Sequence, residues 1–104
     1  AAAFLASADD VPVGFAACAL RWEYVEGTEQ SPAGYLEGIF VAAAFRRCGA
    51  AAGLLRRCEA WAKEKGCAEF ASNCELENEE SRLFHAACGF SEVCRTINFA
   101  KRLA

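Results

Sequence analysis

The sequence predicts an α+β fold of the α/β type, with a mixed β-sheet, in one domain spanning residues 1–104. The first observation is the order of its segments, which reads strand, strand, strand, helix, strand, helix, strand, strand. The second is length, because 104 residues can bury one hydrophobic core but not two. The third is composition: alanine inflates the 55% hydrophobic share, so eight Phe, two Trp and scattered aliphatic residues must form that core.

The first three strands are predicted from apolar runs and the segments between them. Phe4–Ala8 and Val13–Arg21 are separated by Asp9-Asp10, a pair suited to a turn, and together predict an antiparallel hairpin. Trp22–Gly34 mixes charged residues, glycine, proline and aromatics without periodicity, which predicts a long loop. Loops of that length in small domains are often functional. Tyr35–Val41 is the third expected strand.

The segment Cys48–Lys65 predicts an amphipathic helix. Its apolar residues recur every three or four positions: Ala51, Leu54, Leu55, Cys58, Trp61 and Ala62. Lysines in the last turn and Gly66 after it are the expected end signals. Cys67–Ser72 then predicts a fourth strand, followed by an acidic loop.

A second helix is expected to begin after Asn78, whose side chain can cap it, with Glu79 and Glu80 in the first turn. Gly89 is expected to end it. Its predicted inner face consists of Leu83, Phe84, Ala87 and Cys88. Two short strands, Phe90–Cys94 and Thr96–Lys101, complete the predicted sheet.

Charge, cysteine usage and hydropathy exclude several function classes. A formal net charge of −3 argues against a nucleic-acid-binding surface, which needs clustered Lys and Arg. Seven cysteines without a Cys-x-x-Cys pair, together with one histidine, fit neither a disulfide framework nor a zinc site. The first ten residues lack the basic start and apolar stretch of a signal peptide, and no run is long enough to span a membrane. We therefore expect a cytoplasmic protein without metal, nucleic-acid or membrane partners.

The residues between the third strand and the first helix form a candidate anion site: Arg46-Arg47-Cys48-Gly49-Ala50-Ala51. Small residues let backbone N–H groups approach a pyrophosphate, and the positive end of the helix dipole and the arginines add attraction. The segment is not a Walker loop and lacks the G-x-G-x-x-G of dinucleotide folds. A basic helix start with small packing residues remains the alternative.

The chain resembles the GNAT superfamily of N-acetyltransferases. Arg46-x-x-Gly49-x-Ala51 matches the family signature Arg/Gln-x-x-Gly-x-Gly/Ala, and Asn78 followed by His85-x-x-x-Gly89-Phe90 repeats the next landmarks in order. The resemblance implies the GNAT acyl-CoA N-acyltransferase fold and acetyl-CoA as cofactor, with its pyrophosphate held by the signature loop. It also implies that the chain lacks the strand and two helices with which that fold normally begins.

Two further cofactor contacts follow from this resemblance. Backbone groups of Ile39, Phe40 and Val41 would pair with the pantetheine arm of the cofactor. Asn78 would contact the arm near the thioester, in addition to or instead of serving as a plain helix cap.

A narrower resemblance, to one subfamily of aminoglycoside 6'-N-acetyltransferases, covers nearly the whole chain. It rests on Arg21-Trp22-Glu23-Tyr24-Val25-x-Gly27, Ser31-Pro32, Tyr35-Leu36-Glu37-Gly38-Ile39-Phe40-Val41 and Gly66-Cys67-x-Glu69-Phe70-Ala71-Ser72. It implies acetyl transfer to the 6'-amine of an aminoglycoside, by direct attack in a ternary complex, hence antibiotic resistance. It also implies a homodimer and an acidic acceptor pocket.

Two residues are candidate catalytic groups. Glu37 is a carboxylate among apolar and glycine neighbours on a strand, where it could hold the incoming ammonium or accept its proton through water. His85 stands where many GNAT enzymes have a tyrosine that protonates the departing thiolate, although a single histidine can equally be structural. Cysteine nucleophilic catalysis is disfavoured because His85 is the only possible partner base.

The expected acceptor-binding residues are Trp22, Tyr24, Glu37, Asn73 and Glu75. The two aromatics could stack on a sugar ring or pack in a dimer interface. The subfamily usually carries Ser-Asp-Thr where this chain has Ser72-Asn73-Cys74, so a carboxylate is replaced by an amide. Two alternatives therefore stay open: acetylation of another amine, such as a polyamine or a protein N-terminus, and a non-catalytic acyl-CoA-binding or dimerisation module.

Overall fold

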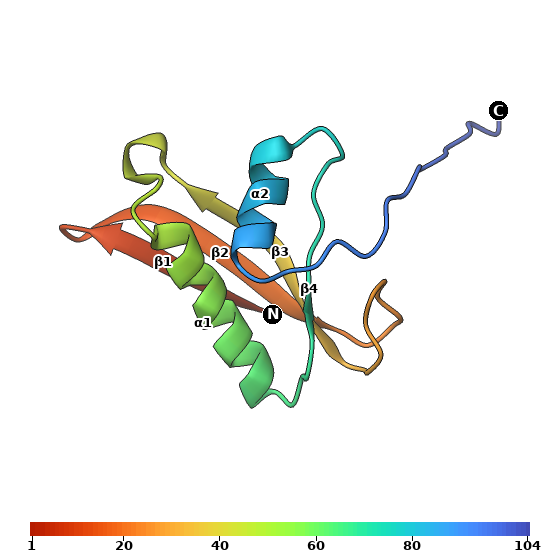
Figure 1. Cartoon of the computed structure of the whole chain (residues 1–104), viewed down its shortest axis with the longest axis horizontal. Helices are drawn as coiled ribbons and strands as arrows, with labels where there is room; N and C mark the ends of the chain where they lie inside the picture. Colours follow the sequence, from red (N-terminus) through yellow and green to blue (C-terminus); the bar gives the residue numbers. More distant parts are fainter. The chain divides into compact units, whose positions relative to one another are not determined.

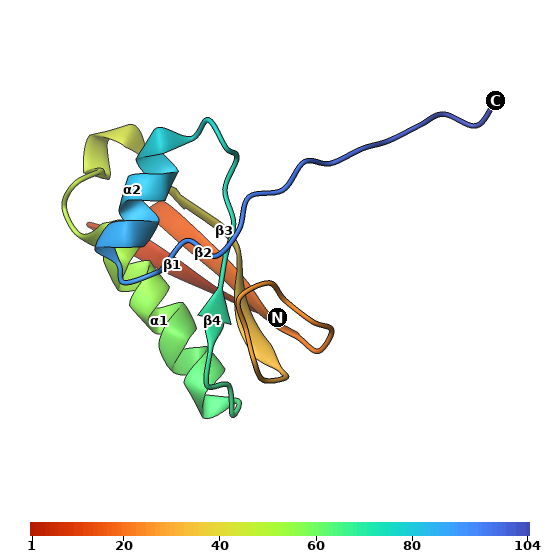
Figure 2. The ribbon, with the colours of Figure 1, turned by 45° about the vertical axis from the view of Figure 1, so that its right-hand side comes forward.

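A computed structural model describes residues 1–104, and the chain divides into two units, residues 1–73 and 74–104. The first unit holds β1 (Ala2–Ala8), β2 (Val11–Arg21), β3 (Ala33–Val41), a 3-10 turn at Ala43–Phe45, α1 (Ala50–Glu64) and β4 (Phe70–Ala71). The second holds α2 (Glu79–Ala87). In Figures 1 and 2, α1 crosses one face of the sheet formed by the first three strands.

The sheet is mixed, as predicted, with strand order β1-β2-β3-β4. β1 and β2 form an antiparallel hairpin in which Ala8 pairs with Val11 across the two-residue turn Asp9-Asp10. Both aspartates have positive φ, 49° and 65°, as a type I′ hairpin turn requires. β2 and β3 are antiparallel, and β3 and β4 are parallel.

α1 covers the sheet through the apolar stripe that its sequence predicts. Leu54, Leu55, Cys58 and Ala62 are buried on the helix. They meet a core that includes Ala16, Cys18, Ala33 and Leu36 of the sheet. Because both thiols are fully buried, the pKa of Cys18 is raised and that of Cys58 rises to about 12, helped there by a hydrogen bond between the two. Both cysteines therefore behave as small core residues.

Glycine ends both helices in the same way. After α1, the Cys67 N–H bonds to the Ala62 carbonyl and the Gly66 N–H to that of Lys63. After α2, the Phe90 and Gly89 N–H groups repeat the pattern on the carbonyls of His85 and Ala86. Each pair is a Schellman motif, with Gly66 and Gly89 at φ of 91° and 93°. The predicted glycine stops are confirmed.

Several boundaries differ from the prediction. α1 begins at Ala50 rather than Cys48, because Gly49 is left-handed at φ 87° and acts as the N-cap. β3 begins at Ala33, which shortens the preceding loop to residues 22–32. The expected strand Cys67–Ser72 contains only the two residues of β4, because only they pair with β3.

The two predicted C-terminal strands, Phe90–Cys94 and Thr96–Lys101, are wrong. The structure shows no strand after residue 71, and residues 91–104 are exposed throughout. A strand needs a neighbouring backbone to satisfy its N–H and C=O groups, and these segments pair with none. Neither is the predicted inner face of α2 buried, because no residue of that helix is.

Neither α1 nor α2 combines the length and the hydropathy that a membrane-spanning helix needs.

Candidate functional site

The edge of β3 is open over most of its length. Parallel pairing with β4 covers only Gly34 and Tyr35, opposite Phe70 and Ala71. β3 continues to Val41, whereas β4 ends at Ala71. The backbone of β3 beyond Tyr35 therefore has a strand partner only on its β2 side.

A β-bulge decides which backbone groups of β3 face the open edge. Ala17 pairs with Gly38 and the next residue of β2 with Leu36, so Glu37 is the extra residue. Beyond the bulge, the Ala42 N–H bonds to the Val13 carbonyl of β2 at 2.8 Å. Since consecutive strand residues present their backbone groups to opposite edges, Ile39 and Val41 present theirs to the open edge.

The loop between β3 and α1 is shaped by two left-handed residues, Arg47 at φ 61° and Gly49 at φ 87°. No side chain caps the helix at Gly49. The first N–H groups of α1 therefore lack a protein partner, apart from that of Gly53, which bonds to the Gly49 carbonyl at 2.9 Å. A Cβ atom built on Gly49 would meet nothing within 4 Å, so the space before the helix is open.

Arginine charge surrounds this helix start. Arg46 Nε donates to the Val41 carbonyl at 2.9 Å, and its guanidinium lies 5.9 Å from the centroid of the Phe40 ring. Arg47 is exposed beside it. Unpaired N–H groups, the positive end of the helix and two guanidinium groups suit a diphosphate anion. The site fits the pyrophosphate that the sequence predicts there.

Glu37, the bulged residue, is held by Arg21 at the end of β2. Arg21 Nη2 and Nε donate to the same oxygen, Glu37 Oε1, at 2.8 and 3.2 Å. This hydrogen bonding raises the pKa of the Arg21 guanidinium, which also lies 4.1 Å from the centroid of the Tyr35 ring. Glu37 keeps 40% of its side chain exposed, and its Oε2 accepts no protein hydrogen bond. That oxygen is available to a ligand.

The loop of residues 22–32 carries the two aromatic candidates. Trp22 is 66% exposed and Tyr24 is 75% exposed, so neither is a core residue. Trp22 directly follows Arg21, the residue that binds Glu37. The first unit thus combines the acidic candidate, the aromatic candidates and the open edge of β3.

The remaining candidates lie at the end of the first unit or in the second. Asn73 and Glu75 are exposed loop residues. Asn78 caps α2, its Oδ1 accepting the Ser81 N–H at 3.0 Å, as predicted. His85 Nδ1 lies 2.7 Å from the Ser81 carbonyl, and its ring lies 5.0 Å from that of Phe90. When Nδ1 donates to this carbonyl, which can only accept, His85 can act as an acid at Nε2 only as the imidazolium.

The sequence interpretation missed the Arg21–Glu37 ion pair and the role of Glu69, which bonds to the loop from 40 residues away. Arg21 was visible only as the last residue of a strand. Its pairing with Glu37 depends on strand register and on a bulge, which the hydrophobic pattern does not reveal.

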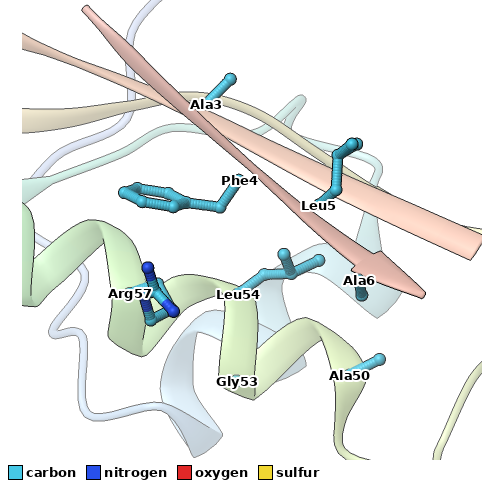
Figure 3. A pocket seen from close by; sticks show the side chains of 8 residues that line it. All are labelled: Ala3, Phe4, Leu5, Ala6, Ala50, Gly53, Leu54 and Arg57. Atoms are coloured by element: carbon cyan, nitrogen blue, oxygen red, sulfur yellow. The ribbon is translucent and has the colours of Figure 1, made fainter. Parts of the chain in front are cut away.

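A separate hollow of about 500 Å³ lies between β1 and the start of α1 (Figure 3). Phe4 and Leu54 point into it, and the Arg57 guanidinium lies 5.0 Å from the centroid of the Phe4 ring. Among the predicted site residues only Ala50 lines it. This hollow is therefore distinct from the open edge of β3.

Comparisons with known proteins place this geometry in a family. The model of the acetyltransferase (GNAT) family matches residues 1–90. The chain therefore belongs to the GNAT family of acetyltransferases, and the expected GNAT fold is confirmed.

Within that family, the chain is similar to proteins named aminoglycoside N(6')-acetyltransferase. Aminoglycoside N(6')-acetyltransferase type 1 of Acinetobacter haemolyticus is 43% identical over 99 residues, covering 95% of this chain and 68% of that protein. The protein of the same name from Salmonella typhimurium is 45% identical, covering 97% and 70%, and that from Acinetobacter baumannii 48% identical, covering 81% and 58%. This chain thus spans 58 to 70% of the length of these three relatives.

Solved structures of aminoglycoside N-acetyltransferases are similar to this chain in both fold and sequence. The aminoglycoside N-acetyltransferase AAC(6')-Iy in complex with CoA has a TM-score of 0.92 and 44% identity, with 97% of this chain and 75% of that chain covered. The same enzyme was also solved with the bisubstrate analog CoA-S-monomethyl-acetylneamine, again with a TM-score of 0.92.

Proposed function

We propose that this protein transfers the acetyl group of acetyl-CoA to a primary amine, the 6'-amine of an aminoglycoside antibiotic, and so confers resistance. The observation that carries the proposal is the open edge of β3, which leads directly into an uncapped, arginine-flanked helix start. Relatives named as aminoglycoside 6'-N-acetyltransferases at 43 to 48% identity support the choice of acceptor.

Acetyl-CoA would bind along this edge. Backbone groups of Ile39 and Val41, with Phe40 between them, would pair with the pantetheine arm. The N–H groups from Cys48 to Ala51 and the guanidinium groups of Arg46 and Arg47 would hold the pyrophosphate. Asn78 would meet the arm near the thioester through its amide N–H₂, because its Oδ1 is used as the helix cap.

In the proposed reaction, the neutral amine nitrogen attacks the thioester carbonyl carbon. The C–N bond forms, the C–S bond breaks, and no covalent enzyme intermediate arises. Glu37 Oε2 takes the proton that leaves the amine, directly or through water. His85 in its imidazolium form returns a proton to the leaving thiolate. Holding both reactants together lowers the barrier by roughly 7 to 11 kcal/mol in well-oriented cases.

The acceptor would lie against the loop of residues 22–32. Trp22 and Tyr24 offer exposed rings for a sugar face, and Asn73 and Glu75 offer polar groups for its amines. An amide at position 73 can accept a hydrogen bond from an ammonium but adds no charge, so acidic groups elsewhere must supply the attraction for a polycation. We further propose that the enzyme works in the cytoplasm as a homodimer.

The experiment is thiol release from acetyl-CoA with kanamycin or tobramycin as acceptor, with spermidine and no acceptor as controls. Saturable turnover with the aminoglycosides alone is the expected result. Turnover with spermidine alone would assign another amine. Coenzyme A binding without turnover on any amine would overturn the enzymatic proposal and leave an acyl-CoA-binding module.

A further inference from the structure

The loop of residues 22–32 is held in one shape by two local contacts. In the first, the Thr28 N–H and the Thr28 hydroxyl both donate to the Val25 carbonyl, at 3.0 and 2.6 Å, closing a turn in which Gly27 has a φ of 83°. Ser31 Oγ donates to the Trp22 carbonyl at 2.7 Å and ties the two ends of the loop together. These contacts give the loop an internal shape but do not fix it to the sheet.

A third, long-range contact supplies that attachment. Glu69 Oε1 accepts the N–H of Glu29 at 2.8 Å and that of Gln30 at 2.9 Å, and its Oε2 lies 3.1 Å from the first of these nitrogens. The backbone carbonyl of Glu69 also accepts the Gly34 N–H at 2.9 Å. Glu69 thus binds both the loop, at residues 29 and 30, and the start of β3. Figures 1 and 2 both show the orange loop beside the start of β4.

The exposed surface of the loop combines carboxylates with aromatic rings. Its three glutamates, Glu23, Glu26 and Glu29, are exposed, as are the rings of Trp22 and Tyr24. Glu69 instead turns its carboxylate to backbone N–H groups, where a charge-assisted hydrogen bond is roughly twice as strong as a neutral one. Carboxylates with aromatic faces are what a polyamine built on sugar rings requires.

We infer that Glu69 is a positioning residue, which fixes the loop of residues 22–32 as a preformed wall of the acceptor site. It does not touch the reacting atoms. It removes the ordering cost that a mobile loop would add to acceptor binding, since pre-organisation raises affinity by cutting that cost. The inference rests on the proposed function for the identity of the acceptor, whereas the attachment of the loop can be tested without it.

The test compares Glu69→Ala and Glu69→Asp, which remove or withdraw the acceptor oxygens, with Glu69→Gln. The Gln variant keeps an Oε1 that can accept both N–H groups, so it should rescue the contact. Glu64→Ala, at the exposed end of α1, is the matched control. All variants keep the backbone carbonyl that bonds to Gly34.

The first readout is hydrogen exchange of the Glu29 and Gln30 amides in the full chain. Exchange should accelerate about tenfold in Glu69→Ala and Glu69→Asp and stay at the wild-type rate in Glu64→Ala. Glu69→Gln, which keeps the acceptor oxygen but loses its charge, should show a smaller acceleration than the Ala and Asp variants. Unchanged exchange in both the Ala and Asp variants would overturn the attachment, whether or not the protein turns over any amine.

The second readout is kinetic. The KM for tobramycin should rise roughly tenfold in Glu69→Ala, with kcat and the KM for acetyl-CoA within about twofold of wild type. Accelerated exchange with an unchanged tobramycin KM would overturn the role in acceptor binding. A wild-type protein that turns over no aminoglycoside fails the proposed function. Calorimetric titration with tobramycin then tests Glu69 by itself: weaker binding in Glu69→Ala than in Glu69→Gln supports the role, and equal binding overturns it.

Discussion

The open edge of β3 and the loop of residues 22–32 differ in the chemical groups that they offer to a ligand. At the open edge, the useful groups are backbone N–H groups, which every non-proline residue of the segment from Ile39 to Ala51 carries. In the loop and around Glu37, the useful groups are particular side chains. The contacts that hold them join positions 16, 39 and 40 residues apart.

This difference predicts how each region responds to substitution. Apart from Arg46 and Arg47, whose guanidinium groups would face the pyrophosphate, changes of side chain at the open edge should matter only where they alter backbone conformation. Changes around the loop should matter wherever they remove a charge or a hydrogen bond. The cofactor and acceptor halves of the proposed site can therefore be separated by measuring acetyl-CoA binding and acceptor kinetics on the same variants.

The largest effect is expected from Glu37→Gln. The amide cannot take the proton of the amine, so kcat/KM for the aminoglycoside should fall by roughly 10²- to 10⁴-fold, while the Kd for acetyl-CoA changes less than about twofold. Steady-state kinetics and calorimetric titration check the two numbers. Glu64→Gln, on the exposed end of α1, is the control and should match wild type. If kcat/KM falls by less than tenfold, Glu37 binds the acceptor amine but does not take its proton.

The cofactor half of the proposed site is tested by Gly49→Val. At φ 87° a β-branched residue is strained by about 1 to 3 kcal/mol, although the space around Gly49 is open. We expect the Kd for acetyl-CoA to rise at least about tenfold, with little change in the acceptor KM.

Gly53→Ala is the matched control for Gly49→Val. Its Cβ would meet only an Arg56 nitrogen at 3.8 Å, and its helical position favours alanine by about 1 kcal/mol. The control should bind acetyl-CoA like wild type and melt slightly higher. Equal acetyl-CoA affinity in both variants would mean that the helix start does not hold the cofactor.

The sequence was most informative where local rules apply. The Asp9-Asp10 turn, the glycine stops of both helices and the Asn78 cap each depend on residues close together in the chain. The apolar stripe of α1 was equally readable, because 3.6-residue periodicity and burial coincide in a helix packed on a sheet. These features predicted the first hairpin and both helices correctly.

Long-range features could not be predicted in the same way. The Glu37 bulge and its pairing with Arg21 follow from register, and Glu69 reaches the loop only because the start of β4 lies beside β3. The C-terminal runs Phe90–Cys94 and Thr96–Lys101 carry strand-like residues but pair with no strand. Strand propensity reflects packing on neighbours more than an intrinsic preference of the backbone, so it cannot supply a missing partner.

The smallest effect should come from Arg21→Gln, which leaves Glu37 in place but removes its guanidinium. The side chains of this ion pair are about 40% exposed, so solvent screens the attraction and we expect kcat/KM to fall only roughly two- to fivefold. Arg56→Gln on the exposed face of α1 is the control. A rise in kcat/KM would instead show that Arg21 competes with the substrate ammonium for the carboxylate. Because the acetyl-CoA Kd should not move in either case, this substitution separates orientation of Glu37 from every property of the open edge.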